Sequence, residues 1–290
     1  MLLIQLLING LQVGALYALT AAGFSLIFGT TRVFHLAHGS AFVIAAYAFY
    51  GMVALGGAHW LPALLVAAAA AMLFGVLLDR AVYAPIRRHE GSFFTLFIAS
   101  FGIAIVVQNL VGIGFGRSFV TLTTPLSRSV EVLPGVFVSP LAGVAMLCAV
   151  LFFAALQLFM TRTHRGVALR ALSENPELVR AYGMSPARLS TLAFALGSLL
   201  VVPAAALTVA TSGLNPAIGS HVMLISLAAT IVGGVGSLRG AACAGLLLGL
   251  AENLALWKLE PQWSEAVTFV VLFLFIVARP SGFFGRAATH

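Results

Sequence analysis

Few side chains in this sequence could do chemistry, and most of them lie within apolar stretches. His35 and His38 stand three positions apart, so a helix would place both imidazoles on one face, where they could share a metal ion. No third ligand follows at a companion spacing, and we predict no metal site. Two alternatives stay open for His38. It could line a path through the protein beside Gly39 and Ser40, or it could bond to a backbone carbonyl.

Three further polar side chains interrupt apolar segments. Gln108 and Asn109 follow the run IASFGIAIVV, and an unsatisfied amide costs several kcal/mol in a lipid-like medium. Both must therefore face protein or water, either bonded to a neighbouring helix or in contact with a transported molecule. Glu252 leaves the same choice. It could also reach the outer interface, because Lys258 follows only six positions later.

Helix-breaking residues mark a third region. Asn215, Pro216 and Gly219 open the segment 218–236, which closes with GGVGS. Breakers at both ends predict a broken or re-entrant helix whose freed backbone groups line a path, and the glycine run 233–249 also suits close helix packing. The segment AHGSAFVI at 37–44 resembles AIGSHVML at 217–224, which either an internal repeat or a chance match explains.

Composition indicates the class of protein that positions these residues. Of 290 residues, 61% are apolar and 8% are charged, and the mean hydropathy is +1.08. So little polar surface cannot solvate a globule but suits a bilayer, which predicts an all-α polytopic membrane protein with a single domain over 1–290. The net charge of +7 is spread over short loops, which indicates membrane topology and no nucleic-acid partner.

Apolar runs of about 20 residues predict eight crossings, or nine if 218–236 passes fully through. The expected spans are 7–29, 35–56, 61–79, 93–114, 136–160, 189–211, 218–236, 240–257 and 263–279. Loops rich in arginine stay cytoplasmic, so Arg80, Arg87 and Arg88 mark one inner loop and residues 161–188 mark another. The N-terminus is then outside, and with nine crossings Arg279 and Arg286 are inside.

The loop 161–188 is a polar island that carries its own helix signals. Asn175 caps, Pro176 starts and Gly183 ends one short predicted helix, PELVRAY. The island is either an ordinary connector or a docking loop for a soluble partner. Our candidates for coupling to such a partner are Arg170, Glu174, Glu177, Arg180 and Gly183.

The sequence contains a single lysine, Lys258, which follows Trp257. A phosphate loop of the Gly-Lys-Ser/Thr type is therefore excluded, and we expect no cofactor in this chain. If transport is driven by ATP, separate partner subunits must hydrolyse it.

An ordered set of segments resembles the membrane subunit of bacterial ABC importers for branched-chain amino acids, the LivH-like permease family. The segments are INGLQVGALYAL, HLAHGS, RAVYAPIRR, IASFGIAIVVQN, ENPELVRAYGM, NPAIG and GGVGSLRGAACAGLLLGLAE. The resemblance implies a bacterial inner-membrane permease subunit without enzymatic activity. It also implies a second related permease, two cytoplasmic ATPase subunits that dock on 174–184, and a periplasmic substrate-binding protein.

One departure leaves the cargo open. Where the family has Asn-Phe-Ala-His-Gly-Glu, this chain has HLAHGS at 35–40, so Ser40 replaces an acid. Branched-chain amino acids are the expected cargo, and urea, short amides or other amino acids are the alternatives. An ion-coupled secondary transporter is a rival, for which Glu252 is the acid available within a span, and an intramembrane metal hydrolase is another.

Overall fold

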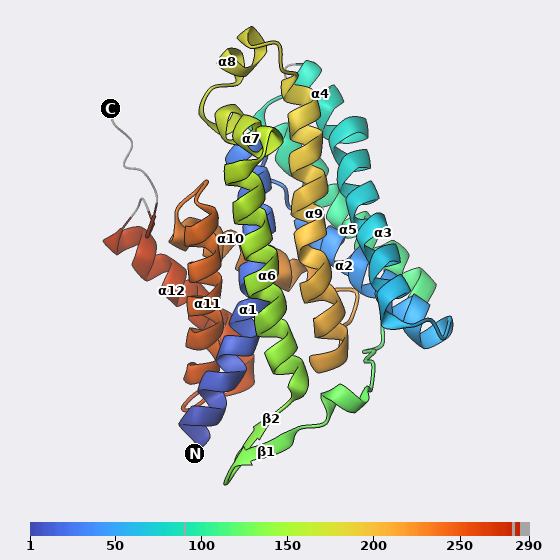
Figure 1. Cartoon of the computed structure of the whole chain (residues 1–290), viewed down its shortest axis with the longest axis vertical. Helices are drawn as coiled ribbons and strands as arrows, with labels where there is room; N and C mark the ends of the chain where they lie inside the picture. Colours follow the sequence, from blue (N-terminus) through green and yellow to red (C-terminus); the bar gives the residue numbers. More distant parts are fainter. Residues whose placement is uncertain (90, 280–281, 285–290) are drawn as a thin grey trace.

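The long apolar stretches form α-helices, because inside a bilayer a helix satisfies every backbone N–H and C=O within its own segment. A computed structural model describes residues 1–89, 91–279 and 282–284. The helices (Figure 1) are α1 (Leu2–Thr31), α2 (His38–Tyr50), α3 (Trp60–Leu78), α4 (Ala84–Arg88), α5 (Phe93–Phe115), α6 (Pro140–Arg162), α7 (His164–Glu174), α8 (Pro176–Ala181), α9 (Pro186–Thr211), α10 (Ile218–Gly233), α11 (Leu238–Ala255) and α12 (Ser264–Ala278).

Short irregular elements complete the chain. Two π-helical turns, η1 (Gly51–Leu55) and η2 (Asp79–Tyr83), continue α2 and α3, and two 3-10 turns lie at Pro125–Ser127 and Pro261–Trp263. Strands β1 (Val130–Leu133) and β2 (Val136–Val138) pair antiparallel as a hairpin. An all-α architecture is thus confirmed, apart from this small hairpin in an extramembrane loop.

Eight helical segments of the described residues are long and apolar enough to cross a membrane, which confirms the predicted eight crossings. The segment predicted at 61–79 is longer, because η2 and α4 extend it to Arg88. The segment predicted at 218–236 forms α10, whose 16 residues give a length of about 24 Å, short of the roughly 30 Å hydrocarbon core. Residues 212–217 lead into it without helical structure.

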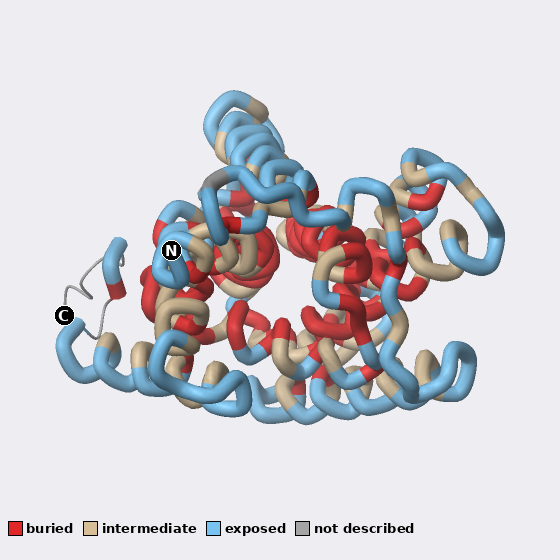
Figure 2. Tube along the Cα trace, turned by 90° about the horizontal axis from the view of Figure 1, so that it is seen from below, coloured by how far each residue is buried: buried red, intermediate tan, exposed pale blue. Residues whose placement is uncertain are grey.

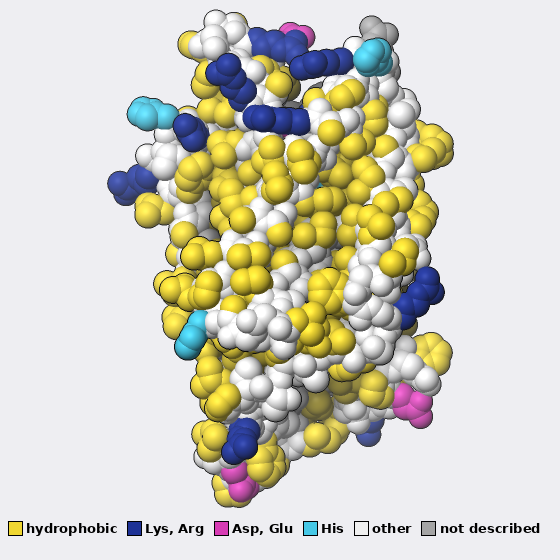
Figure 3. All heavy atoms as spheres, turned by 90° about the vertical axis from the view of Figure 1, so that its right-hand side faces the viewer, with side chains coloured by type: hydrophobic (Ala, Val, Ile, Leu, Met, Phe, Trp, Pro, Cys, Tyr) yellow, Lys and Arg dark blue, Asp and Glu magenta, His cyan; other side chains and the backbone are white. Residues whose placement is uncertain are grey.

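The two ends of the bundle differ in charge. Helices α4, α7 and α8 lie at one end, and the N-terminus and the hairpin lie at the other (Figure 1). Most lysine and arginine side chains in Figure 3 gather at the α7–α8 end, above a broad hydrophobic belt. The positive-inside rule makes this end cytoplasmic and places the described N-terminus outside. Arg279 is described, whereas Arg286 lies outside the described residues.

Helices α1 and α9 form the centre of the bundle, where the buried residues concentrate (Figure 2). Their backbones cross closely at Gly23 and Gly197, where a Cβ added to Gly23 would lie 2.6 Å from the Gly197 carbonyl oxygen. The glycine run of α11 has the same role, because a Cβ at Gly245 would lie 2.6 Å from the Ala18 backbone nitrogen of α1. The packing function expected of these glycines is therefore present in the fold.

Candidate functional site

The first turns of α2 and α10 meet inside the bundle. Gly39 and Gly219 touch backbone to backbone, and an added Cβ at Gly219 would lie 2.9 Å from the Gly39 carbonyl oxygen. These glycines occupy matching positions of the two similar segments, and each is followed by a serine, Ser40 or Ser220. The two segments are thus in contact, in the arrangement expected of an internal repeat with a site between its copies.

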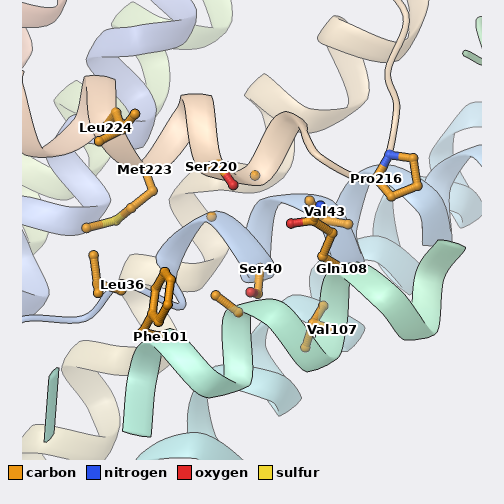
Figure 4. Close-up of a pocket in the computed structure, with 13 residues that line it drawn as sticks. Leu36, Ser40, Val43, Phe101, Val107, Gln108, Pro216, Ser220, Met223 and Leu224 are labelled. Atoms are coloured by element: carbon orange, nitrogen blue, oxygen red, sulfur yellow. The ribbon is translucent and has the colours of Figure 1, made fainter. Parts of the chain in front are cut away.

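A cavity of about 250 Å³ lies beside this contact (Figure 4). Helices α2, α5 and α10 supply its walls, and Phe101 and Gln108 project into it from α5. The residues predicted from the sequence that line it are Gly39, Ser40, Gln108, Pro216 and Gly219. Seven further lining residues were not predicted, because their apolar types resemble every other membrane-facing position: Leu36, Val43, Phe101, Ala104, Val107, Met223 and Leu224. The polar Ser220, next to the predicted Gly219, was not predicted either.

The lining is mostly apolar with a few polar groups. Ser40, Ser220 and Gln108 supply two hydroxyls and an amide, and no described lining residue is charged. The N-termini of α2 and α10 add the positive ends of two helix dipoles, while the Ser40 and Ser220 N–H groups donate to the Ala37 and Ala217 carbonyls. Such a cavity can hold a small solute that combines an apolar side chain with an anionic group.

A second cavity of about 270 Å³ continues the first one toward the outer end. Gln108 and Pro216 line both cavities, and Asn109, Asn215 and Arg117 line the second one. The Asn109 amide donates to the Ile105 carbonyl at 2.8 Å and accepts from Arg117 at 3.2 Å. Both hydrogen bonds are therefore local, made within α5 and the turn after it rather than to another helix.

The two histidines lie behind the cavity rather than on its wall. His38 Nε2 is 3.0 Å from the Thr20 carbonyl oxygen, and His35 Nδ1 is 2.8 Å from the Tyr83 hydroxyl. Both imidazoles are fully buried. The structure thus places His38 in the carbonyl-bonded arrangement that the sequence left open. No cluster of three or more metal-ligating side chains occurs among the described residues.

Glu252 is buried outside the cavity and does not reach the outer interface, which was one of the alternatives that the sequence left open. The side chain is 4% exposed, accepts a hydrogen bond from Tyr17 at 2.8 Å and accepts another from Thr268. The Tyr17 hydroxyl also lies 3.2 Å from His221 Nε2, and His221 Nδ1 is 3.1 Å from Glu265. This chain of polar groups joins α1, α10, α11 and α12, and its burial explains why Glu252 cannot snorkel.

A second buried carboxylate, Asp79, was not singled out from the sequence. It is 1% exposed, forms an ion pair with Arg87 at 2.6 Å and accepts hydrogen bonds from Ser190 and Thr191 at 2.9 and 2.7 Å. These contacts fasten the inner end of α3 to α9. Glu252 is therefore not the sole acid within a membrane-crossing segment of the described residues. The arginines that follow Asp79 in the sequence indicated that a basic partner for it was close by.

The polar island folds into two helices, α7 and α8, so the prediction of one short helix was incomplete. Asn175 Oδ1 accepts from the Glu177 and Leu178 N–H groups, both at 2.9 Å, and Gly183 adopts a positive φ of 75°, as the predicted cap and stop require. The helix α7 was missed because its Thr163 cap lies beside the end of α6. All five coupling candidates, Arg170, Glu174, Glu177, Arg180 and Gly183, are exposed.

The loop also exposes apolar side chains at the cytoplasmic end. Leu178 is 52% exposed and Tyr182 is 76% exposed, whereas Val179 is buried against the bundle. A short capped helix held by Val179 thus presents a mixed apolar and charged surface. Such a surface suits contact with a soluble protein.

A bundle of membrane-crossing helices around an internal cavity, with a structured loop at its cytoplasmic end, defines a polytopic permease. Residues 6–276 match the family described as branched-chain amino acid transport system / permease component, and the chain belongs to this family. The family and the eight spans place it in the inner membrane as a multi-pass protein.

Relatives agree with this assignment, and a solved structure shares the fold. The high-affinity branched-chain amino acid transport system permease protein BraD of Pseudomonas aeruginosa is 31% identical over 98% of this chain and 96% of its own length. The corresponding LivH protein of Escherichia coli K12 is 27% identical over the same shares. The fold resembles PsaBC from Streptococcus pneumoniae, solved in complex with Fab, with a TM-score of 0.55, 14% identity, and coverage of 97% of this chain and 92% of that one.

Proposed function

We propose that this chain is the permease subunit of an ABC importer that carries leucine, isoleucine or valine into the cell. The observation that carries the proposal is the apolar cavity at the meeting point of α2 and α10. Val43, Val107 and Met223 can surround a branched side chain, and the two helix starts can face the carboxylate. The similarity to BraD and LivH, which are named as branched-chain amino acid permeases, supports the same cargo.

Recognition by helix starts also accounts for Ser40. An acidic residue at this position would repel the carboxylate of a zwitterion and attract its ammonium group. With Ser40 and Ser220 as matched hydroxyls, the cavity is neutral and recognises shape and hydrogen bonds. The same neutrality keeps urea and short amides as alternative cargoes, because both are small and uncharged.

A second, related permease completes the path in this proposal. Phe101 is 53% exposed and Leu224 is 38% exposed although both line the cavity, so the described residues leave it open on one side. Helices α5 and α12, which flank that side, are the least buried of the apolar helices. A homologous subunit that covers this side would close the cavity and keep lipid out of it.

Two ATPase subunits supply the energy by docking on α7 and α8. The support is the exposed pair Leu178 and Tyr182 next to Glu177 and Arg180, on a helix whose two ends are fixed by Asn175 and Gly183. A periplasmic binding protein would deliver cargo to the outer end, where Arg117 and Asn215 line the second cavity. Closure of the ATPase subunits on the inside and docking of the binding protein on the outside would then shift the bundle between an outward-open and an inward-open state.

The test is reconstitution of this chain in proteoliposomes with its neighbouring permease, ATPases and binding protein. We expect ATP-dependent uptake of radiolabelled leucine, isoleucine and valine, with competition among the three and none by urea or acetamide. The chain alone should take up nothing under a sodium or proton gradient. Uptake by the single subunit would replace this proposal with ion-coupled transport, and competition by urea or acetamide would reassign the cargo.

A further inference from the structure

A polar recess lies at the cytoplasmic end of the groove between α6 and α11, on the surface of α1. Its volume is about 180 Å³, and its charged wall residues are Arg170 from α7 and Arg239 from α11. Neither arginine forms an ion pair with another described residue. Two guanidinium groups without carboxylate partners make the recess a site of positive potential.

A buried hydroxyl in the same recess has no partner. Ser25 lines the recess, is 1% exposed, and its Oγ makes no hydrogen bond to any described residue. The N-terminus of the 18-residue helix α11, capped by Ser237, lies at the same place. An unsatisfied buried hydroxyl costs about 1–3 kcal/mol, and an acceptor atom bound in the recess would satisfy it.

An apolar cavity of about 500 Å³ continues the recess toward the membrane centre along the same three helices. Arg239 lines both spaces and is the one charged residue among the described residues of the apolar cavity. On α1 the lining of the two spaces runs from Leu11 to Thr30, which corresponds to about 29 Å along the helix axis. That length is enough for one leaflet of a bilayer roughly 40–45 Å thick, headgroup region included.

We propose that this groove binds one anionic phospholipid of the cytoplasmic leaflet. Its phosphate would accept hydrogen bonds from Arg170, Arg239 and the Ser25 hydroxyl, and one acyl chain would fill the cavity beside Ala149 and Cys243. A free phosphate would leave the apolar part empty, and a zwitterionic lipid would bring an ammonium group to the arginines. Joined polar and apolar parts therefore favour an anionic lipid.

The site lies on a different part of the surface from the solute cavity. Helix α6 stands at the front of the view in Figure 1, and α2, α5 and α10, which surround the solute cavity, lie behind it. The lipid would touch α7 through Arg170, next to the loop proposed to meet the ATPases. Bound lipid would thus steady α7 against α6 and α11 without entering the transport path.

Native mass spectrometry of the full chain, purified from nanodiscs, tests the proposal. We expect one phosphatidylglycerol to stay bound per chain and phosphatidylcholine to dissociate. Arg239→Gln should lower the retained phosphatidylglycerol about tenfold, because a charge-assisted hydrogen bond is lost. Arg80→Gln is the matched control: Arg80 is also an exposed arginine at the cytoplasmic end, on η2, but it does not line the groove.

A second variant tests the apolar part of the groove. Ala149→Phe places a ring in the cavity and should release the lipid although both arginines remain. Equal retention of phosphatidylcholine, or unchanged binding in Arg239→Gln, would overturn the proposal. Displacement of phosphatidylglycerol by millimolar inorganic phosphate, or full retention in Ala149→Phe, would assign the recess to a free anion instead.

A labelling readout gives the same answer in the bilayer. Cys243 is exposed and lines the groove, so bound lipid should slow its alkylation by N-ethylmaleimide in a Cys148→Ser background. At a lipid concentration ten times the Kd, the rate should fall about tenfold. Protection should disappear in Arg239→Gln and persist in Arg80→Gln, and equal rates in phosphatidylglycerol and phosphatidylcholine would contradict an anionic lipid.

Discussion

Gly39 and Gly219 lie in direct backbone contact where the first turns of α2 and α10 cross. A Cβ on Gly219 would lie 2.9 Å from the Gly39 carbonyl oxygen, and one on Gly39 would clash with the Gly219 carbonyl. Main-chain atoms cannot turn aside as a flexible side chain can. The position of both helix starts, and with it the shape of the cavity, therefore depends on two hydrogen atoms in place of side chains.

Gly39→Ala should separate α2 from α10. Overpacking against backbone typically costs about 1–3 kcal/mol, so we expect a lower Tm of the purified protein and loss of uptake in the assembled importer. Gly102→Ala on α5 is the control, because no atom lies within 4 Å of its added Cβ. It should stabilise the helix by about 0.5–1 kcal/mol. Equal behaviour of the two variants would contradict the contact.

Gln108→Leu should weaken cargo recognition without unfolding the protein. A neutral hydrogen bond contributes about 0.5–1.5 kcal/mol, so the KM for uptake should rise by roughly threefold to tenfold. Asn109→Leu should have a smaller effect, because its amide already bonds to Ile105 and Arg117. Initial uptake rates at several leucine concentrations give the KM of both variants. A larger rise in KM for Asn109→Leu than for Gln108→Leu would place the cargo site nearer the outer end.

Asn175→Ala should uncouple transport from ATP hydrolysis. The Asn175 side chain caps α8 with two hydrogen bonds, and loss of an N-cap costs about 1 kcal/mol, enough to unfold a six-residue helix. Cargo-stimulated ATPase activity should fall, whereas the Tm of the bundle should not change. Ser139→Ala removes the cap of α6 at the other end of the protein and should preserve the stimulation.

Gly183→Ala examines the same loop through its backbone. Gly183 has a φ of 75° with no atom within 4 Å of an added Cβ, so the substitution adds strain of about 1 kcal/mol and no clash. Gly57→Ala is closely matched, with a φ of 61° and equally open space in the outer loop before α3. Stimulated ATP hydrolysis should fall in Gly183→Ala alone, and a similar fall in both variants would remove α8 from coupling.

The effect of Glu252→Gln on uptake distinguishes an ATP-driven permease from an ion-coupled one. Tyr17 and Thr268 donate to different oxygens of Glu252, so the Gln amide oxygen can accept from one of them and the amide NH2 can donate to the other hydroxyl oxygen. The residue does not line the solute cavity. ATP-dependent uptake should therefore persist at near-normal rates. Glu252→Ala should instead destabilise the protein by about 1–3 kcal/mol, since two donors lose their acceptor. Loss of uptake in a stably folded Glu252→Gln would favour a role for the carboxylate in transport.

The sequence predicted the parts of this fold that depend on periodicity and caps. The spans, the Asn175 cap and the Gly183 stop follow from local residue types, and five of the candidate residues line the solute cavity. The apolar wall of the cavity could not be predicted, because Val43 and Met223 look like any lipid-facing residue until a partner helix is placed. The burial of Glu252 likewise depends on Tyr17, 235 positions away.

The meeting of two helix starts gives the cavity a polarity that does not titrate. Side-chain carboxylates and imidazoles change charge as protons bind, whereas backbone N–H groups keep the same dipole in acid and in alkali. A permease that receives its solute this way can work next to an acidified periplasm as well as a neutral one. The backbone, rather than any side chain, would then make transport tolerant of external acidity.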